Sequence, residues 1–501
     1  MMAREQSRRV TEALASFFAT PLDVVLERCQ HEDPRAAALA LFHDVAATVP
    51  AYQAFLAEHG VDPEAIRAPE DLRRVPPVTK ASYVLKYPLP DLCRHGRLEA
   101  CDMIAVSSGS TGKPTFWPRF VTDELGVARR FEQAFHDAFR AHERRTLSVI
   151  CFALGTWVGG MFTAACCRHL AAKGYPITVV TPGNNKEEIL RIVGELGPRF
   201  DQVVLLGYPP FLKDVIDAGL ERGVRWADLE VRIVTAGEVF SEAWRTLVAE
   251  RIGARAPAYD FASLYGTADA GVLGVETPLS ITIRRFLAER PDEARRIFGQ
   301  DRLPTLVQYD PFARHFEAEG DRLVFTGDNG APLIRYDILD TGGVIPHDDM
   351  MRSLADLGFD PRASLTHGGA RALPFVFVFG RSDFTVSFYG ANVYPENVTV
   401  GLEQPEISAF TSGKFVMTVE RDADENERLA VVIELAPGQA PSEERRRAAA
   451  SSIETHLVRL NSEYRTYVPA ERRAPLVTLL PAGDPSYFPV GVKHRYTRRP
   501  A

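Results

Sequence analysis

Three Val- and Ile-rich segments, each followed by an amphipathic segment, constrain the fold of this 501-residue chain more than any other feature. They are PITVVTPG before NKEEILRIVGELG, DQVVLLGYP before FLKDVIDAGLERG, and LEVRIVTAGE before SEAWRTLVAERIG. A short apolar run favours a strand buried on both faces, and a 3.6-residue periodicity favours a helix. The alternation predicts an α/β fold with buried parallel sheets flanked by helices.

The pattern changes twice along the chain, which predicts two domains. Up to about residue 100, segments such as PRAAALALFHDVAATV indicate helices. Beyond Arg302 the apolar runs become shorter and strand-like. From about Gly380, KFVMTVERDADENERLAVVIEL is typical of a hairpin and SEERRRAAASSIETHLVRLN of a helix. We therefore expect a large N-terminal domain over 1–379, with a helical first part, and a small mobile α+β domain over 380–501.

Charge and cysteine usage exclude several classes of partner. The net charge of −8 does not favour binding to nucleic acid or to an anionic membrane surface. None of the six cysteines lies in a Cys-x-x-Cys pair, so we expect free thiols, a cytoplasmic protein and no structural zinc. The uncharged run from Leu147 to Cys167 is interrupted by three glycines, which favours a strand, a loop and a buried helix over a membrane span.

The segment SSGSTGKP, Ser107 to Pro114, has the composition of a loop that holds a polyanion. Its small residues leave backbone N–H groups unshielded, four hydroxyls stand beside them, and Lys113 adds a positive charge. The preceding CDMIAV is a predicted strand, so the loop would lie at a strand end. The spacing from Gly109 to Gly112 differs from that of a Walker A loop. Taken alone, the segment is also compatible with a polar surface turn.

Four segments in order resemble those of the adenylate-forming superfamily, which includes acyl- and aryl-CoA ligases. SSGSTGKPT is similar to its phosphate loop, and LYGTADAG to its Tyr-Gly-x-Ser/Thr-Glu motif. PLIRYDILDTG and GRSDFTVSFYGANVYPENV resemble a central segment and the hinge region of the phenylacetate–CoA ligase branch. The order of the four, and the change of pattern at the fourth, make the resemblance specific.

The resemblance implies a role for particular residues in binding ATP. The β- and γ-phosphates would be held by Ser107, Ser108, Gly109, Ser110, Thr111, Gly112 and Lys113. The adenine would lie along Ala236, Gly237 and Glu238 and under Tyr265, next to Gly266. Asp340 and Arg381 would reach the ribose, and Asp269 would bind Mg²⁺. Asp340 is also compatible with an ordinary turn aspartate, and Tyr265 with a core aromatic.

Two further residues are implied to act during the reaction cycle. Asp383 matches the hinge about which the small domain turns. Lys493, near the chain end in FPVGVKHRYTRR, corresponds to a lysine that, with Lys113, would stabilise charge during adenylation. In the family this lysine directly follows a glycine, whereas here Val492 separates Lys493 from Gly491. The alternative is that Lys493 is a solvated lysine of the chain end.

The acid substrate would bind between FALGTWVGG and LLGYPP. Phe152, Trp157 and Tyr208 offer flat apolar walls beside Gly160, which suits an aromatic or medium-sized apolar acid. Plain core packing explains the same residues equally well.

The implied function is ATP-dependent ligation of a carboxylic acid to coenzyme A, with Mg²⁺ as a cofactor. An amine, a carrier-protein thiol or a nitrogen oxyacid is an alternative acceptor, and the sequence leaves a homodimer open. Ala268 and Asp269 replace the family's Ser/Thr–Glu pair, and YDILD replaces its Tyr-Arg-Thr-Gly-Asp. These departures also admit a non-catalytic nucleotide-binding protein.

Overall fold

The Val- and Ile-rich segments form adjacent parallel strands, as predicted. A computed structural model describes residues 2–107, 115–156, 158–300, 303–381, 385–488 and 496–497. The parallel strands stand in the order β4, β3, β5, β6, β7. Their bounds are β3 Thr146–Ile150, β4 Ile177–Val180, β5 Gln202–Gly207, β6 Val231–Ala236 and β7 Phe261–Thr267. Every residue of β3 and β5 is buried, as expected for strands covered on both faces.

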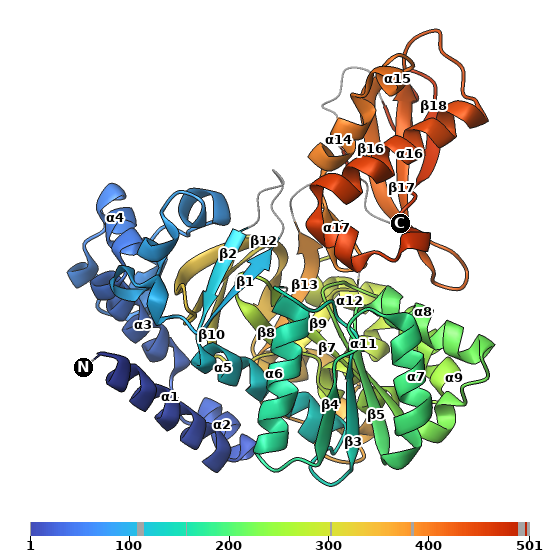
Figure 1. Cartoon of the computed structure of the whole chain (residues 1–501). Helices are drawn as coiled ribbons and strands as arrows, with labels where there is room; N and C mark the ends of the chain where they lie inside the picture. The colour runs from blue at the N-terminus through green and yellow to red at the C-terminus, as the bar shows by residue number, and fades with distance from the viewer. Residues whose placement is uncertain are drawn as a thin grey trace. The chain divides into compact units, whose positions relative to one another are not determined.

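Helices surround this parallel sheet (Figure 1), and polar caps determine where several of them begin. They are α5 Val121–Gln133, α6 Val158–Ala172, α7 Lys186–Leu196, α8 Pro209–Glu221 and α9 Glu242–Ile252. Asn185 caps α7 by accepting the N–H of Glu188 at 3.2 Å, and Ser241 caps α9 by accepting that of Trp244 at 3.0 Å. Across the described part of the chain, we find no helix that is both long and apolar enough to span a bilayer.

The sheet changes from parallel to antiparallel between β7 and β8, and then continues through β9, β13, β12, β11 and β10. The bounds are β8 Gly271–Val275, β9 Thr305–Gln308, β10 Arg314–Glu319, β11 Arg322–Gly327, β12 Leu333–Ile345 and β13 Phe375–Arg381. Among the described residues this single sheet has eleven strands. The mixed α/β fold class expected from the sequence is therefore confirmed.

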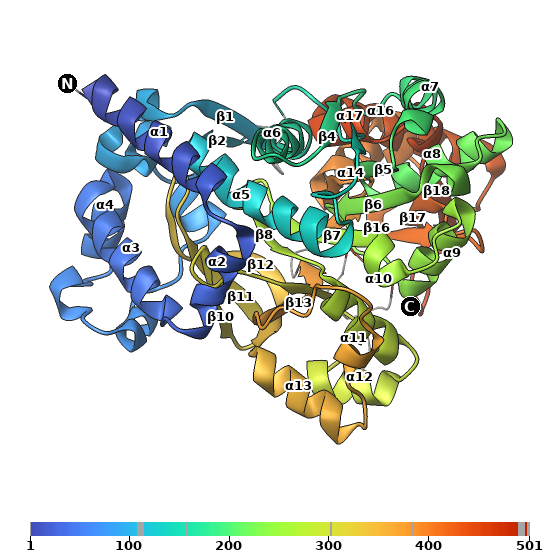
Figure 2. The ribbon, with the colours of Figure 1, turned by 90° about the horizontal axis from the view of Figure 1, so that it is seen from below.

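Among the N-terminal helices, the third packs against the antiparallel strands β10 and β11, and the first two pack against α5 (Figure 2). These N-terminal helices are α1 Met2–Ala19, α2 Leu22–Glu27, α3 Pro34–Thr48 and α4 Pro50–Glu58. The chain then runs along β12. The N–H of Val78 donates to the carbonyl of Arg335 at 3.0 Å, and the carbonyl of Val78 accepts the N–H of Asp337 at 2.8 Å. Strands β1 Met103–Ser107 and β2 Thr115–Arg119 follow and pair with each other.

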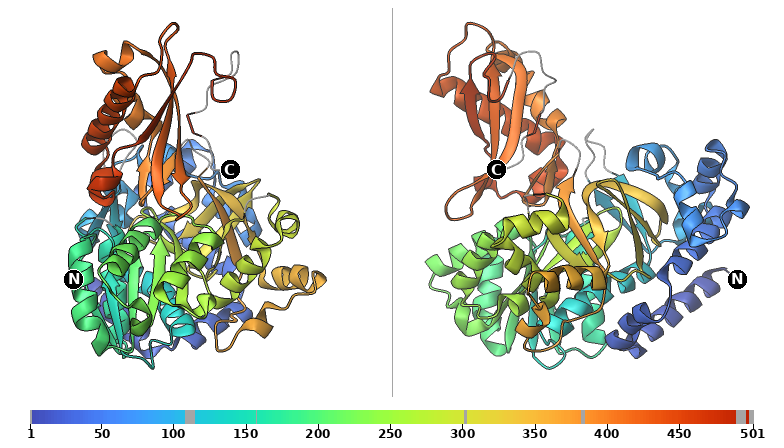
Figure 3. Two further views of the ribbon diagram at one scale, coloured as in Figure 1. Left: turned by 90° about the vertical axis from the view of Figure 1, so that its right-hand side faces the viewer. Right: turned by 180° about the vertical axis from the view of Figure 1, so that it is seen from behind.

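The chain divides into two units. The first comprises Met1–Val106, Phe116–Gly207 and Val215–Gly380, and the second Ser107–Thr115, Tyr208–Asp214 and Arg381–Ala501. In the second unit, β16 Thr411–Arg421 and β17 Glu427–Leu435 form the predicted hairpin, and β18 Leu476–Leu480 pairs parallel to β17. The predicted helix is α16 Glu443–Leu460, which packs along this sheet together with α14 Pro395–Leu402 (Figure 3).

Candidate functional site

Tyr265 and Asp340 come from different strands and contact each other directly. Tyr265 lies in β7, Asp340 lies in β12, and the tyrosine hydroxyl donates a hydrogen bond to the Asp340 carboxylate at 2.7 Å. Only 6% of the Asp340 surface is exposed, so the carboxylate is held in a defined position. The structure thus brings together two residues that the sequence predicts for adenine and ribose binding.

A bulge in β12 places Asp340 there. Arg322 of β11 pairs with Thr341 of β12, and the next pair is Val324 with Asp337. A step of two residues in β11 is therefore matched by a step of four residues in β12. The extra residues bend the strand, a common way of redirecting a side chain next to an active site. Leu339, with a φ of +65°, lies within this bulge.

Asp337 stabilises the bulge. One oxygen of its buried carboxylate accepts the N–H of Leu339 at 2.9 Å, and the other pairs with Arg322 at 2.6 Å. The first of the two contacts closes an Asx-type turn directly before Asp340. The change from the family's Tyr-Arg-Thr-Gly-Asp to YDILD therefore supplies a local support for Asp340.

Asp269 follows β7 and is held from two sides. The hydroxyl of Tyr336 donates a hydrogen bond to its carboxylate, and Nη2 of Arg119 donates to its backbone carbonyl at 3.0 Å and to that of Ala268. Burial lowers the pKa of the Arg119 guanidinium, and the carboxylates of Asp123 and Asp269 oppose that shift. The Tyr336 bond engages Oδ2, and no described residue donates a hydrogen bond to Oδ1, so the carboxylate retains an oxygen that suits a hard cation.

The segment Ala236 to Glu238 begins beside Tyr265. Ala236 ends β6 and is paired with Leu264, the residue before Tyr265. Gly237 has a φ of +85°, so the chain turns immediately after the strand. In β7, a Cβ on Gly266 would lie 2.6 Å from the carbonyl oxygen of Gly271, so the close β7–β8 pairing requires glycine at this position.

The residues predicted to line the acid pocket fall into both units. Phe152 is buried in the first unit, where a Cβ on Gly160 would lie 2.2 Å from the carbonyl oxygen of Ala153. Tyr208 belongs to the second unit, where its ring lies 5.2 Å from that of Tyr467. Their role in binding the acid stays a prediction.

Several predicted residues lie outside the described residues. Ser107 is the buried last residue of β1, and Arg381 ends β13. The residues not described are Ser108, Gly109, Ser110, Thr111, Gly112, Lys113, Trp157, Asp383 and Lys493, together with the side chain of Arg381.

Sequence reasoning missed the residues that hold the predicted ones in place. Tyr336 and Asp337 lie inside the PLIRYDILDTG segment, so their proximity to Asp340 was a usable signal. Arg119 and Arg322 gave no such signal, because each reaches the site from another strand.

The fold and this site together define a class of protein. The structure of 2-hydroxyisobutyryl-CoA ligase in complex with 2-HIB-AMP and CoA matches 93% of this chain and 88% of its own with a TM-score of 0.61, at 14% sequence identity. The same enzyme in the postadenylation state matches 93% and 89% with a TM-score of 0.52, at 15% identity. The chain therefore has the fold of the two-domain adenylate-forming enzymes.

Sequence comparison identifies a particular relative. Phenylacetate-coenzyme A ligase from Thermus thermophilus is 28% identical over 366 residues, which cover 72% of each chain. No family model matches the chain. The resemblance to the phenylacetate–CoA ligase branch of the adenylate-forming superfamily is confirmed.

Proposed function

We propose that this protein is an AMP-forming acid–thiol ligase, which activates a carboxylic acid with ATP and transfers the acyl group to coenzyme A. The observation that carries the proposal is the contact of Tyr265 with Asp340 on β12, the strand whose Tyr336 contacts Asp269, in a chain homologous to a phenylacetate–CoA ligase. The aromatic residues Phe152, Trp157 and Tyr208, and the name of that relative, favour an aromatic acid.

In the first step a carboxylate oxygen of the acid attacks the α-phosphorus of ATP. The bond from this phosphorus to the oxygen bridging the β-phosphate breaks, and pyrophosphate leaves. Asp340 would accept hydrogen bonds from the ribose hydroxyls, and Tyr265 would keep the carboxylate oriented while its ring faces the adenine. Rigid positioning of the nucleotide favours the in-line geometry of this displacement.

In the second step the sulfur of coenzyme A attacks the acyl carbon, and AMP leaves with the bonding electron pair. A turn of the small domain about Asp383 would remove the groups that serve adenylation from the site and bring in those that serve thioester formation. Bound Mg²⁺ would neutralise part of the phosphate charge. Asp269 fits that role because its carboxylate is held by Tyr336 and retains an oxygen for the metal.

Acid-dependent exchange of labelled pyrophosphate into ATP tests the first step. We expect exchange with phenylacetate or benzoate, and less with aliphatic acids of similar size. Mass analysis of the products with and without coenzyme A identifies the acceptor. Exchange without a coenzyme A thioester would indicate an amine, a carrier-protein thiol or a nitrogen oxyacid as acceptor. Absence of exchange with every acid would contradict the proposal and favour a non-catalytic nucleotide-binding protein.

Tyr336→Phe tests the support of Asp269. Loss of the hydroxyl removes the hydrogen bond that orients this carboxylate. Loss of a group that hydrogen-bonds a metal ligand typically costs about 10–100-fold in metal affinity. We expect the Mg²⁺ concentration for half-maximal exchange to rise by about tenfold or more. The acid concentration at half-maximal rate should stay unchanged. Equal Mg²⁺ requirements in the variant and the parent protein would show that Tyr336 does not position a metal ligand.

A further inference from the structure

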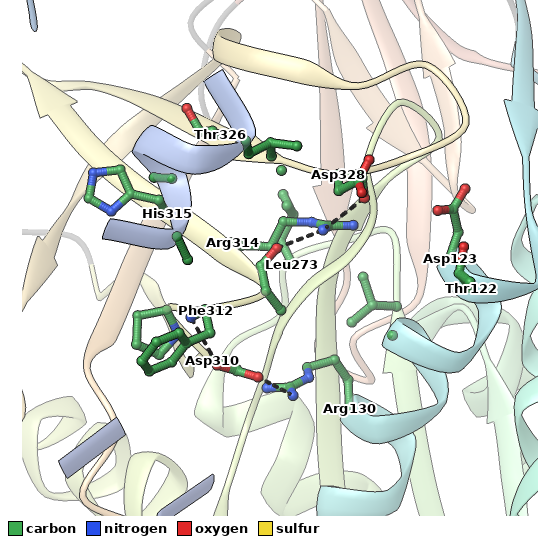
Figure 4. Close-up of a pocket in the computed structure, with 18 residues that line it drawn as sticks. Thr122, Asp123, Arg130, Leu273, Asp310, Phe312, Arg314, His315, Thr326 and Asp328 are labelled. Atoms are coloured by element: carbon green, nitrogen blue, oxygen red, sulfur yellow. Dashed lines mark hydrogen bonds and ion pairs between the residues drawn. The ribbon is translucent and has the colours of Figure 1, made fainter. Parts of the chain in front are cut away.

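A cavity of about 330 Å³ lies in the first unit. Its walls come from α3, α5, β8, the segment from Asp310 to His315, and the end of β11 (Figure 4). Among the described residues, none of those predicted to bind ATP, Mg²⁺ or the acid lines it. Its volume is at the lower end of the range for small-molecule sites, about 300–1,000 Å³.

Two arginines line this cavity with hydrogen-bonding capacity that the protein does not use. Arg130 is 3% exposed and pairs through Nη2 with Asp310 at 3.2 Å, while its Nε and Nη1 find no acceptor among the described residues. Nε of Arg314 likewise has no acceptor there. Buried donors of this kind almost always have a partner, so each of these nitrogens calls for water or an anion.

The carboxylates of the cavity, in contrast, are already engaged. Asp310 accepts hydrogen bonds from Arg28, Arg130 and the N–H of Phe312. Asp123 accepts the N–H groups of Phe120 and Gly330. At the rim, Asp328 pairs with Arg94 at 2.8 Å.

Three carboxylates, those of Asp123, Asp310 and Asp328, line the cavity beside two arginines, so the unpaired guanidinium nitrogens favour an anion and net charge does not. Asp310 is shared by two guanidinium groups, those of Arg28 and Arg130. No described carboxylate lies within ion-pairing distance of Arg314, which donates instead to the backbone carbonyls of Ala313, Ala270 and Asp328 and to the side chain of Asn329. The carboxylates of Asp123 and Asp328 still attract its charge from farther away. Burial lowers the pKa of Arg314 to about 10, so the group stays charged at neutral pH.

We propose that this cavity binds a small oxyanion, of the phosphate or carboxylate type, through Arg130 and Arg314. A guanidinium offers a planar array of donors that matches the oxygens of both groups. The free nitrogens of Arg130 are covered by protein, so the anion would reach them after a turn of the guanidinium. The hydrogen bond from Arg130 to Asp310 restrains that turn.

An occupant of this cavity would lie close to the loop that carries Asp269. Nη2 of Arg314 donates at 3.0 Å to the carbonyl of Ala270, the residue directly after Asp269. Val272 and Leu273, which follow in β8, line the cavity itself. The oxyanion site and the predicted metal ligand are therefore joined by a short stretch of backbone.

Gly126 offers a way to test the site without removing either arginine. It lies in α5 one helical turn before Arg130, lines the cavity, and a Cβ there would meet nothing within 4 Å. Gly126→Glu would place a tethered carboxylate in the cavity, within the i,i+4 spacing that pairs acidic and basic side chains on a helix. Gly126→Gln fills the same space without charge, and Gly126→Ala is the matched control.

The experiment measures the binding of inorganic phosphate and of acetate by calorimetry, at constant ionic strength set with chloride. We expect binding of at least one anion to the parent protein and to Gly126→Ala. Binding should be weaker by about tenfold or more in Gly126→Glu and Gly126→Gln, because both side chains fill the space that the anion would occupy. In Gly126→Glu the carboxylate also removes the attraction of the arginines for the anion. All three substitutions gain helix propensity, so the comparison is between Gly126→Glu and Gly126→Gln, and we expect the higher melting temperature for Gly126→Glu without added anion. The stronger of the two anions identifies the oxyanion type.

Phosphate could also bind at the predicted phosphate loop, and the Gly126 variants distinguish the two sites. Binding that is identical in the parent protein, Gly126→Ala and Gly126→Glu would assign the anion to another place and overturn the proposal. The absence of binding by either anion to the parent protein would equally overturn it, since water alone would then fill the cavity. Neither result would bear on the ligase activity, which the exchange experiment tests separately.

Discussion

Replacing Asp340 by alanine is expected to reduce kcat/KM for ATP by about 10²-fold, while the protein remains folded. Hydrogen bonds to a charged group contribute about 1.5–3 kcal/mol each, and the variant would lose those to both ribose hydroxyls. The hydroxyl of Tyr265 would also lose its acceptor. The measurement is acid-dependent pyrophosphate exchange at varied ATP concentration.

A nucleotide analogue separates ribose recognition from a general loss of activity. The parent protein should discriminate against 2′,3′-dideoxy-ATP, whereas Asp340→Ala should use it almost as well as ATP. Asp348→Ala serves as the matched control, because the side chain of Asp348 is 89% exposed on α13 (His347–Asp356). A variant at Asp340 that keeps the full preference for ATP would show that another group binds the ribose.

Lys493→Ala is expected to slow acyl-adenylate formation by about 10²–10³-fold, the usual cost of removing a preorganised donor that stabilises developing charge. Transfer of the acyl group from a supplied acyl-adenylate to coenzyme A should be largely unchanged, because the lysine would act only in the adenylation arrangement of the small domain. The two half-reactions are measured separately, by pyrophosphate exchange and by thioester formation.

The matched control for Lys493 is the only other lysine after Asp383. Lys414 lies in β16 and pairs with Glu434 at 3.0 Å, so Lys414→Ala should leave both half-reactions unchanged. Small and equal effects of Lys493→Ala on both half-reactions would instead indicate a solvated tail lysine. The catalytic cation would then have to be sought elsewhere in the chain.

Local patterns in the sequence were sufficient to predict most of the elements. The Val- and Ile-rich runs became β4, β5 and β6, and the amphipathic segments after them became α7, α8 and α9. The hairpin β16–β17 and the helix α16 also lie where the sequence predicts them. The spacing of apolar residues predicts these elements because it indicates which face of a helix or strand is buried. That spacing can be read within a window of a few residues.

The support of the site was not predictable in this way. Asp340 meets Tyr265, 75 residues earlier in the chain, only because β12 carries a bulge whose position depends on its pairing with β11. The sequence places Asp337 close to Asp340 and marks it as a departure from the family motif, but its role in the bulge depends on the same pairing. Arg119 reaches the carbonyl of Asp269 across 150 positions.

The sequence by itself determined the α/β class, the succession of strands and helices, and the residue types that make adenylation chemistry feasible. The tertiary structure alone decided which side chains hold Asp340 and Asp269, and it enclosed Arg130 and Arg314 in one cavity. The physical reason is that backbone conformation follows local periodicity. The meeting of distant side chains follows strand register, bulges and burial, which arise only when the whole sheet is assembled.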